Sequence, residues 1–501
     1  MILRTVIISI ILTIYFFSES SLYAQEKQDS SVIKLLMEIE KLKTEAVFKN
    51  ANWGICVITA DSGITLATYN DTTTLIPAST MKAINTAAAL SILGKDYTFK
   101  TKLCYDGVID ENGTLNGNLY IKGGGDPTLG SPRIDTMNDI KYMLPLWVNK
   151  IKAQGIKNIN GAIVGDASIF DDTIAPPSWI YGDLGNYYGA GSSGLNFHEN
   201  AFRIIIKSGK KYKDSAKIFD IDPPIPYINI INNVKTGGAY TPEDLWIYGE
   251  PYNNSRNIKG IVPRNKKEFP VRASIPDPSF FSAYYLYKTL LDSGIVVSDS
   301  ATTQKILIEN NKNNCKARKT FFIQESPPLD TIVYYTNQKS INPYAESIVR
   351  ILAYEKTGIG STYTGTQIVT QFWKSKGLEL KKFVMIDGSG LSKENRVSTR
   401  QLAEITRCYL TDSLFSVFYH TLPIAGVSGT ISTIFKGTFA ENNLRAKSGY
   451  MKGIRAYTGY VYNKNNKLLT FGIIVNDHTA SSYKMKSMLE KIMVLISETE
   501  F

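Results

Sequence analysis

The residues of this sequence best suited to chemistry are a serine and a lysine three positions apart, Ser79 and Lys82. They follow Pro77 and lead into an alanine-rich run ending at Leu90, which predicts a helix that begins near Ser79. Residues three apart on a helix share a face, so the amine of Lys82 would lie beside the hydroxyl of Ser79. A serine hydroxyl needs an adjacent base to act as a nucleophile, and a lysine kept neutral by its surroundings can be that base. The pair predicts an acyl-transfer site in which Ser79 attacks and Lys82 takes its proton.

This spacing alone does not identify a site, because the same pattern starts at Ser31, Ser208 and Ser481. An acyl-transfer site also needs groups that protonate the leaving nitrogen and position the substrate amide. Ser340 and Asn342 can supply both, from a loop directly before a predicted helix over 342–354. The alternative is that one of them only caps that helix. A second Ser-x-Asn starts at Ser255, inside a region that is set apart below.

The third group is the tripeptide Lys447-Ser448-Gly449. Lys447 offers a positive charge and Ser448 a hydroxyl for a substrate carboxylate, while Gly449 lets a substrate lie against the strand edge as an added strand. The backbone N–H groups of Ser79 and Tyr450 would form the oxyanion hole. A charged Lys447 near Lys82 would also lower the pKa of Lys82.

Three further tripeptides of the Lys-(Ser/Thr)-Gly type start at Lys207, Lys235 and Lys356. The first two precede Ser340 in the chain, and the third fits a helix end at which Gly358 is the cap. Only Lys447 is followed by a predicted strand hairpin, 455–462 and 468–476, that would continue a sheet.

The elements around these residues predict an α+β fold. Strands over 53–59 and 64–69 lead into the Ser79 helix, and the chain closes with the 455–476 hairpin and an amphipathic helix over 482–496. Between residues 97 and 320 the pattern changes to short strands, such as 100–105 and 118–122, separated by glycine-rich turns. We interpret 97–320 as an insertion of two modules, the inner one roughly 197–270.

The first 24 residues predict a secretory signal. A short basic start precedes an apolar stretch over 5–17 that is too short for a typical membrane span, and small residues lead to a cleavage site after Ala24. An uncleaved anchor is the alternative. No cysteine lies near the cut, and no later segment is apolar enough to cross a bilayer. The prediction is a periplasmic protein without a stable membrane span after signal removal.

Composition narrows the function classes. The net charge is +11, but the lysines are dispersed, which favours solvated basic faces over a nucleic-acid groove and allows a weak attraction to an anionic envelope polymer. The three histidines are scattered, so neither a metal site nor a cofactor is predicted. The four cysteines are far apart and fit either two disulfides or buried free thiols.

In this order, Ser-x-x-Lys, Ser-x-Asn and Lys-(Ser/Thr)-Gly resemble the penicillin-recognising serine acyltransferases. Further stretches resemble the class C low-molecular-mass penicillin-binding proteins, type 4, which are D-alanyl-D-alanine carboxypeptidases that also act as endopeptidases. The matching stretches are 77–82, 123–129, 165–168, 194–196 with 199–200, 387–392, 422–427 with 429–430, and 447–449. They extend over nearly the whole predicted mature chain, and several are specific to this class rather than to β-lactamases.

The resemblance implies a β-lactamase/transpeptidase-like domain with a five-stranded antiparallel sheet flanked by helices, formed by residues 25–96 and 321–501. It implies that Ser79 is the nucleophile, Lys82 the base, Ser340 a proton relay and Asn342 a contact to the substrate amide. Lys447 and Ser448 would recognise the substrate carboxylate, in peptidoglycan stem peptides and cross-links, and β-lactams would inhibit covalently. Two departures from the family pattern, Ile341 and Pro343, affect the assignment of Ser340 most directly.

Two alternatives remain open at this point. A β-lactamase would turn penicillin over rapidly, whereas a penicillin-binding protein would stay acylated for long periods, and no deacylating carboxylate is evident in the sequence. A non-catalytic wall-binding protein of the same fold would bind cell wall without being labelled by penicillin.

Overall fold

The computed structural model of the chain describes residues 30–134, 138–241, 244–312 and 317–501. The predicted signal at 1–24 and Cys315 therefore lie outside the described residues. Within them, no helix combines the length and the apolar character needed to cross a membrane.

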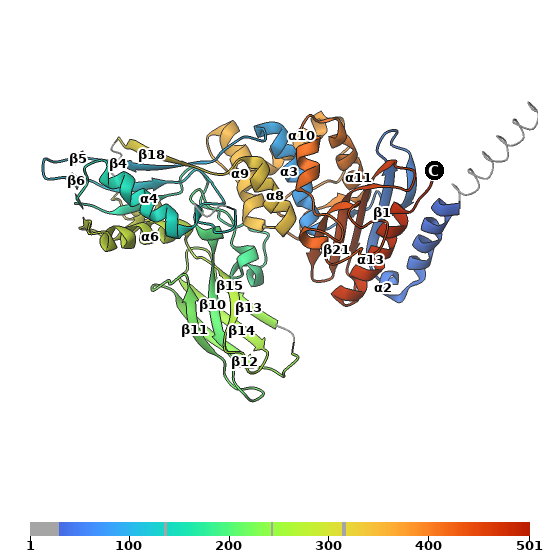
Figure 1. The fold of residues 1–501 in the computed structure, drawn as a ribbon, viewed down its shortest axis with the longest axis horizontal. Helices are drawn as coiled ribbons and strands as arrows, with labels where there is room; N and C mark the ends of the chain where they lie inside the picture. The colour runs from blue at the N-terminus through green and yellow to red at the C-terminus, as the bar shows by residue number, and fades with distance from the viewer. Residues whose placement is uncertain (1–29, 135–137, 242–243, 313–316) are drawn as a thin grey trace, which may run out of the picture.

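The predicted five-stranded antiparallel sheet is present and lies on the right in Figure 1, where β1 and β21 are labelled. Its strands follow the order β2-β1-β22-β21-β20. Its strands are β1 Asn52–Thr59, β2 Thr65–Tyr69, β20 Arg445–Met451, β21 Ile454–Tyr462 and β22 Leu468–Asn476. Strand β1 pairs directly with β22, with Trp53 opposite Val475, so the two ends of the chain form one sheet.

Both faces of this sheet are covered by helices. Successive side chains of a strand point to opposite faces, so the buried residues of each strand pack into two cores, one on each face. Ala456, Tyr460 and Ile474 pack into the core on one face, while Tyr457 and Ile473 pack on the other. The first face is covered by α3 Met81–Leu93, α8 Leu329–Lys339, α9 Asn342–Thr357, α10 Thr362–Ser375, α11 Thr399–Cys408 and α12 Phe415–Thr421. The second is covered by a helix over 30–44, α2 Ala46–Lys49 and α13 Ser482–Ser497.

Local sequence accounts for several of these boundaries. Ser398 and Gln401 form a capping box at the start of α11, with hydrogen bonds of 3.1 and 3.0 Å between each side chain and the backbone N–H of the other. Gly358 ends α9 in the left-handed conformation, at φ 81°. The predicted helix over 342–354 is present and runs one turn further.

The segment between α3 and α8 is rich in strands and projects away from the five-stranded sheet (Figure 1). One sheet has the order β17 Ala301–Thr303, β9 Ile163–Asp166, β7 Leu119–Lys122, β4 Lys100–Tyr105, β18 Lys319–Glu325. A second has the order β16 Val296–Val297, β8 Asn158–Ile159, β6 Thr114–Asn116, β5 Val108–Ile109. The helices of the whole strand-rich segment are α4 Ile140–Lys152, α5 Tyr181–Leu184, α6 Pro278–Asp292 and α7 Gln304–Glu309.

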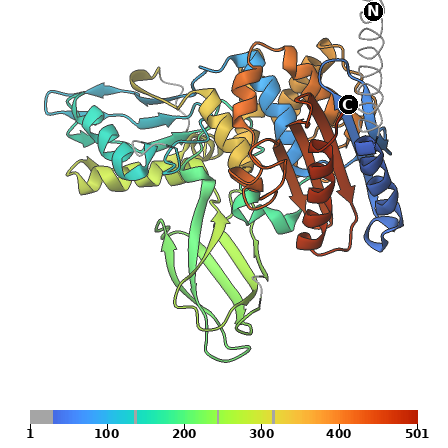
Figure 2. The same cartoon turned by 45° about the vertical axis from the view of Figure 1, so that its right-hand side comes forward.

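Two three-stranded sheets form a separate lobe of this segment, which Figure 2 shows hanging below the rest. They are β11 Lys217–Asp222, β10 Ala201–Lys207, β15 Phe269–Ser274 and β12 Asn229–Thr236, β14 Ser255–Val262, β13 Asp244–Tyr248. A short pairing of β3 Thr74–Leu75 with β19 Val397–Ser398 lies outside these sheets. The division into domains at 97, 320 and roughly 197–270 stays a prediction, although β4 and β18 pair next to both outer limits.

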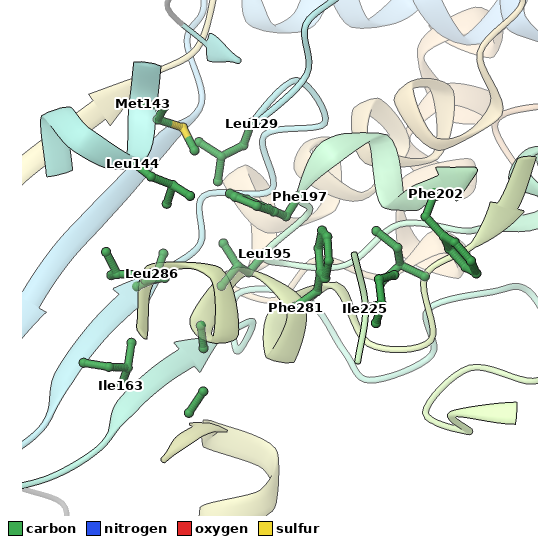
Figure 3. Packing of buried hydrophobic residues seen from close by; sticks show 14 of the residues in the cluster. Leu129, Met143, Leu144, Ile163, Leu195, Phe197, Phe202, Ile225, Phe281 and Leu286 are labelled. Carbon is green, nitrogen blue, oxygen red and sulfur yellow. The ribbon is translucent and has the colours of Figure 1, made fainter. Parts of the chain in front are cut away.

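The strand-rich segment has its own apolar core (Figure 3). Leu195 and Phe197 come from the loop before β10, Phe281 and Leu286 from α6, and Met143 from α4. The rings of Phe197 and Phe281 meet edge to face, with centroids 5.7 Å apart. This core packs α4 and α6 against the loop before β10.

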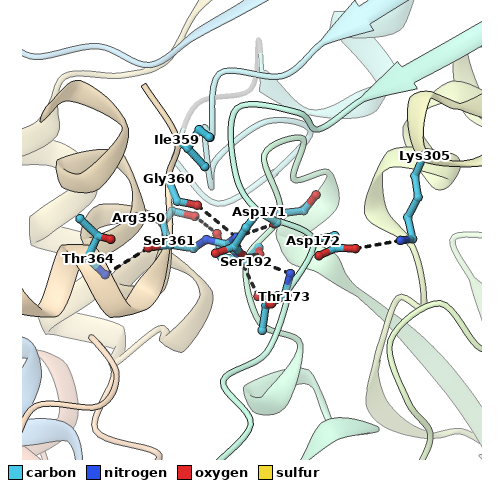
Figure 4. Close-up of polar contacts among 12 residues, drawn as sticks. Asp171, Asp172, Thr173, Ser192, Lys305, Arg350, Ile359, Gly360, Ser361 and Thr364 are labelled. Atoms are coloured by element: carbon cyan, nitrogen blue, oxygen red, sulfur yellow. Dashed lines mark hydrogen bonds and ion pairs between the residues drawn. The ribbon is translucent and has the colours of Figure 1, made fainter. Parts of the chain in front are cut away.

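Arg350, on α9, joins the two parts (Figure 4). Its guanidinium is fully buried and donates to the carbonyl oxygens of Thr173 and Ser192, and to the carbonyl and carboxylate of Asp171 at 2.6 and 2.5 Å. Burying a charge without partners is very costly, so these contacts fix the 171–192 loops against α9.

Candidate active site

Ser79 lies in a tight 3-10 turn, η1 Ala78–Thr80, directly before α3. The sequence predicts a helix starting at Ser79, and the regular helix begins two residues later because Ala78 takes a left-handed conformation, at φ 47°. Gly390 fixes this turn from below, since a Cβ there would lie 1.9 Å from the carbonyl oxygen of Ala78. The serine is partly exposed at the start of a helix that is otherwise buried in the core.

Lys82 is fully buried, and its amine points at Ser79. Its amine donates to Ser79 Oγ at 3.0 Å, to Asn342 Oδ1 at 2.6 Å and to the carbonyl oxygen of Ser389 at 2.7 Å. Burial lowers the pKa of Lys82 to about 7, while the carboxylates of Asp387 and Glu346 act in the opposite direction. A substantial fraction of Lys82 is therefore neutral at neutral pH, as a general base requires.

Ser340 and Asn342 lie where helices α8 and α9 meet. Ser340 ends α8 in the left-handed conformation, at φ 56°, and Asn342 opens α9. The alternative role, a side-chain cap at the start of α9, is not seen, since Ile341 is the capping residue and no side chain bonds there. Pro343 falls in the first turn of α9, where its missing N–H costs no helical hydrogen bond. Asn342 instead bonds Lys82 and donates through Nδ2 to the carbonyl oxygen of Tyr188 at 2.8 Å.

Lys447 brings the third group to the same place. It is buried in β20, and its amine donates to Ser340 Oγ at 3.0 Å and to the carbonyl oxygen of Ser448 at 2.9 Å. Ser448 in turn donates to Thr430 Oγ1 at 2.6 Å. Lys447 therefore bridges β20 to the α8–α9 junction, as the chain order of the three motifs predicts.

The electrostatics of the two lysines differ from the sequence expectation. Burial and the charge of Lys82 both lower the pKa of Lys447 well below its ordinary value. The pKa of Lys82 is lowered by burial rather than by Lys447. The two buried amines repel each other when both are charged. A substrate carboxylate beside Lys447 would raise the pKa of Lys447 and so favour its protonated form.

Strand β20 is the edge strand of the five-stranded sheet and runs beside the turn η1, which carries Ser79. A Cβ at Gly449 would lie 2.7 Å from the carbonyl oxygen of Pro77 and 3.1 Å from the backbone nitrogen of Ser79. Only glycine fits this approach, which brings the backbone of Gly449 next to Ser79. Tyr450 itself is exposed.

The other copies of the motifs lie elsewhere. Ser255-Arg256-Asn257 falls in β14 of the lower lobe, where the buried Arg256 donates to backbone carbonyls including that of Ser274, 3.0 Å away. Lys207 ends β10 and Lys235 is in β12, both in the same lobe. Lys356 is exposed in the last turn of α9, next to the cap at Gly358.

The structure adds two buried carboxylates that the sequence reasoning did not single out, Glu346 and Asp387. Glu346 accepts from the backbone N–H groups of Gly388 and Ser389, and Asp387 accepts from Trp179 Nε1 at 2.8 Å. Glu346 was detectable in the sequence, since it follows Asn342 by four residues and so shares its helix face. Asp387 belongs to one of the stretches that carried the family resemblance, to which no role was attached.

Neither metal ligands nor disulfides contribute to this arrangement within the described residues. No group of three or more His, Cys, Asp or Glu there could hold a metal ion. Cys56, Cys104 and Cys408 are free thiols.

Comparisons with known proteins agree with this geometry. The D-Ala-D-Ala carboxypeptidase 3 (S13) family matches residues 35–496. The chain is 25% identical over 453 residues to the D-alanyl-D-alanine carboxypeptidase DacB of Haemophilus influenzae, covering 89% of each. It is 24% identical to the D-alanyl-D-alanine carboxypeptidase of an Actinomadura species, covering 89% of this chain and 81% of that relative.

Among solved structures, the fold is that of penicillin binding protein 4 (dacB) from Haemophilus influenzae. The TM-score is 0.77 at 24% identity, with 91% of this chain and 97% of the other covered. The same protein complexed with a β-lactam gives a TM-score of 0.72. The predicted transpeptidase-like fold class is confirmed.

Proposed function

Since this chain belongs to the D-Ala-D-Ala carboxypeptidase 3 (S13) family, we propose that Ser79 is the nucleophile with which it cleaves D-alanyl peptide bonds in peptidoglycan. The chain is a serine-type peptidase, a hydrolase of the penicillin-binding protein group. The observation that carries the residue assignment is the 3.0 Å contact between Ser79 Oγ and a fully buried lysine amine.

Acylation follows from the contacts around Ser79. Neutral Lys82 takes the hydroxyl proton as Ser79 Oγ attacks the carbonyl carbon of the penultimate D-alanine. The N–H groups of Ser79 and Tyr450 stabilise the negative oxygen that develops. Ser340 gives its hydroxyl proton to the leaving nitrogen as the C–N bond breaks, and the ammonium of Lys447, which donates to Ser340 Oγ, replaces that proton. Water then attacks the carbonyl carbon of the acyl-enzyme: the proton of the water returns through Ser340 to Lys447, and Lys82 gives its proton back to Ser79 as the ester bond breaks.

Substrate binding uses the edge of the sheet. The stem peptide lies along β20 as an added strand beside Gly449, and Asn342 contacts the substrate amide. Lys447 and Ser448 hold the terminal carboxylate. A β-lactam presents an amide and a carboxylate to the same groups and leaves an acyl-enzyme that hydrolyses slowly. Residues 1–24 direct the chain to the periplasm, where peptidoglycan is found.

Digestion of purified cell-wall sacculi, followed by mass spectrometry of the released muropeptides, tests this function. We expect loss of terminal D-alanine from pentapeptide stems, the carboxypeptidase activity, and conversion of cross-linked dimers to monomers, the endopeptidase activity. A muropeptide profile unchanged by the active protein would contradict the proposal. Rapid turnover of a fluorescent penicillin, in place of a lasting adduct, would identify a β-lactamase, and wall binding without any adduct would identify a non-catalytic binding protein.

Replacing Lys447 tests carboxylate recognition. We expect Lys447→Gln to lower kcat/KM for a D-Ala-D-Ala peptide with a free carboxylate by about 30- to 100-fold, since truncating one partner of a buried charge pair costs about 2–3 kcal/mol. The same peptide with a C-terminal amide should be affected far less. Lys356→Gln is the matched control, because it alters another tripeptide of the Lys-(Ser/Thr)-Gly type, at an exposed helix end. An equal loss for both peptides would refute this role of Lys447.

A further inference from the structure

Helix α9 carries three buried polar side chains one turn apart, Asn342, Glu346 and Arg350. Residues four apart on a helix share a face, so the three form one stripe. Asn342 accepts from Lys82, and Arg350 anchors α9 to the strand-rich segment through Asp171 and Ser192 (Figure 4). Glu346 lies between them, and the mechanism above does not use it.

Glu346 holds the loop that follows Asp387. Its Oε1 accepts from the N–H of Ser389 at 2.7 Å, and its Oε2 accepts from the N–H of Gly388 at 3.3 Å. The same loop is packed tightly on α9, since a Cβ at Gly388 would lie 2.6 Å from the carbonyl oxygen of Ala345. The carbonyl of Ser389 then accepts from the amine of Lys82 at 2.7 Å.

Glu346 is therefore linked to Lys82 through the backbone of Ser389, whose N–H bonds the carboxylate and whose carbonyl bonds the amine. Removing the carboxylate would leave two buried N–H groups without acceptors, and the loop would have to move to satisfy them. Any such movement shifts the carbonyl of Ser389, which is one of the two acceptors, with Asn342 Oδ1, that aim the amine of Lys82 at Ser79.

We propose that Glu346 is a positioning residue for the base: it fixes the carbonyl of Ser389 against Lys82, and its negative charge favours the protonated form of Lys82. This inference rests on the proposed function, in which Lys82 is the base that activates Ser79. It adds a residue that touches neither substrate nor nucleophile.

The charged groups that act on Glu346 and Lys82 come from four elements. Glu346 interacts with Lys82 on α3, Asp387 on the loop and Arg350 one turn further along α9, and Lys82 also interacts with Lys447 on β20. Burial and the charge of Asp387 raise the pKa of Glu346, while hydrogen bonds from Ser389 and Gly388 lower it. The charges of Glu346 and Lys82 are opposite, so each favours the other.

The direction of the effect follows from this coupling. An ionised Glu346 stabilises the ammonium form of Lys82, so it raises the pH needed to free the base. Glutamine keeps an oxygen that can accept from the N–H of Ser389 but carries no charge. With Glu346→Gln, Lys82 therefore loses its proton at lower pH than in the wild type.

The experiment measures the second-order rate constant for acylation of Ser79 by a fluorescent penicillin from pH 5 to pH 9, with the adduct followed by intact-protein mass spectrometry. We expect the midpoint of the acidic limb to fall by about half a unit to one unit in Glu346→Gln, because an opposite charge near Lys82 has been removed. Glu346→Asp keeps the charge but withdraws the carboxylate by one methylene. It should acylate about 10-fold more slowly at every pH, without a lower midpoint.

Arg350→Lys is the control for general loosening, because it keeps the charge on α9 but loses the forked contact with Asp171 and the nearby carbonyls. It should lower the thermal unfolding temperature and leave the midpoint where it is. A folded Glu346→Gln with the wild-type midpoint would overturn the proposal, and so would an equal downward shift in Arg350→Lys. Should Glu346→Gln fail to fold, Glu346→Asp decides, since a wild-type rate in that variant would overturn it as well.

If the proposed function were wrong, the wild-type protein itself would form no adduct on Ser79. A wild-type protein that is acylated normally, together with variants whose pH profiles are unchanged, refutes only the role of Glu346.

Discussion

Ser79→Ala abolishes both release of D-alanine from a D-Ala-D-Ala peptide and labelling by fluorescent penicillin. The expected loss of kcat/KM is at least about 10⁴-fold, because no other group can form the acyl-enzyme and only binding and oxyanion stabilisation remain. The fold should be retained, since the Ser79 side chain is partly exposed and the turn that holds it is fixed by backbone contacts at Ala78 and Gly390. Peptide hydrolysis and gel fluorescence, with thermal unfolding as a check on the fold, measure these quantities.

Ser208→Ala is the matched control, because it alters another Ser-x-x-Lys of the same chain. Ser208 lies beyond β10 in the lower lobe, where its hydroxyl accepts from the N–H of Lys266 at 2.8 Å. We expect full activity in that variant. Unchanged D-alanine release by Ser79→Ala would end the assignment of the nucleophile.

Lys82→Met removes the base and is expected to lower the acylation rate by about 10³-fold. The variant should still bind a stem peptide, since the groups assigned to the carboxylate, Lys447 and Ser448, are unchanged. Stopped-flow acylation at saturating penicillin separates the two effects. A rate within a few-fold of the wild type would show that another group takes the proton of Ser79.

The same variant has a pH-dependent effect on stability whose sign can be worked out. Folded Lys82 has a pKa of about 7, whereas an unfolded lysine has a pKa of about 10.4. Between these values the unfolded chain binds more protons, so the wild type gains stability as pH rises, by on the order of 2–3 kcal/mol from pH 7 to pH 9. Below pH 7 both states hold the proton and this contribution to the slope disappears.

Lys82→Met lacks this titration, so the difference in free energy of unfolding between wild type and variant should shift toward the wild type from pH 7 to pH 9. Chemical denaturation at pH 6, 7, 8 and 9 measures it. A difference that stays constant over this range would mean that burial does not lower the pKa of Lys82.

Part of this site could be predicted from sequence because each motif is local. Ser79 and Lys82 are three residues apart, and Lys447, Ser448 and Gly449 are adjacent, so a helix turn and a strand edge suffice to arrange them. The strands over 100–105 and 468–476 were predicted with their observed bounds, since turn residues flank both. The capping box of Ser398 and Gln401 at the start of α11 depends on short-range spacing in the same way.

Other features depend on residues hundreds of positions apart. Glu346 and Asp387 act on Lys82 only because α9 and the 387–390 loop pack against α3, and Trp179 reaches Asp387 from the strand-rich segment. The sequence predicts that Lys447 lowers the pKa of Lys82. In the structure burial lowers that pKa instead, and burial depends on the whole core.

The amino-acid sequence by itself predicted the candidate reacting groups, their order along the chain and the class of fold, because those depend on residue type and short-range spacing. Only the tertiary structure decided that burial lowers the pKa of Lys82, which carboxylates oppose that shift, and which side-chain and backbone oxygens the amine contacts. The physical reason is that a pKa and a hydrogen-bond direction are set by everything within a few ångströms, and in this protein those neighbours come from α3, α9, β20, the 387–390 loop and the strand-rich segment.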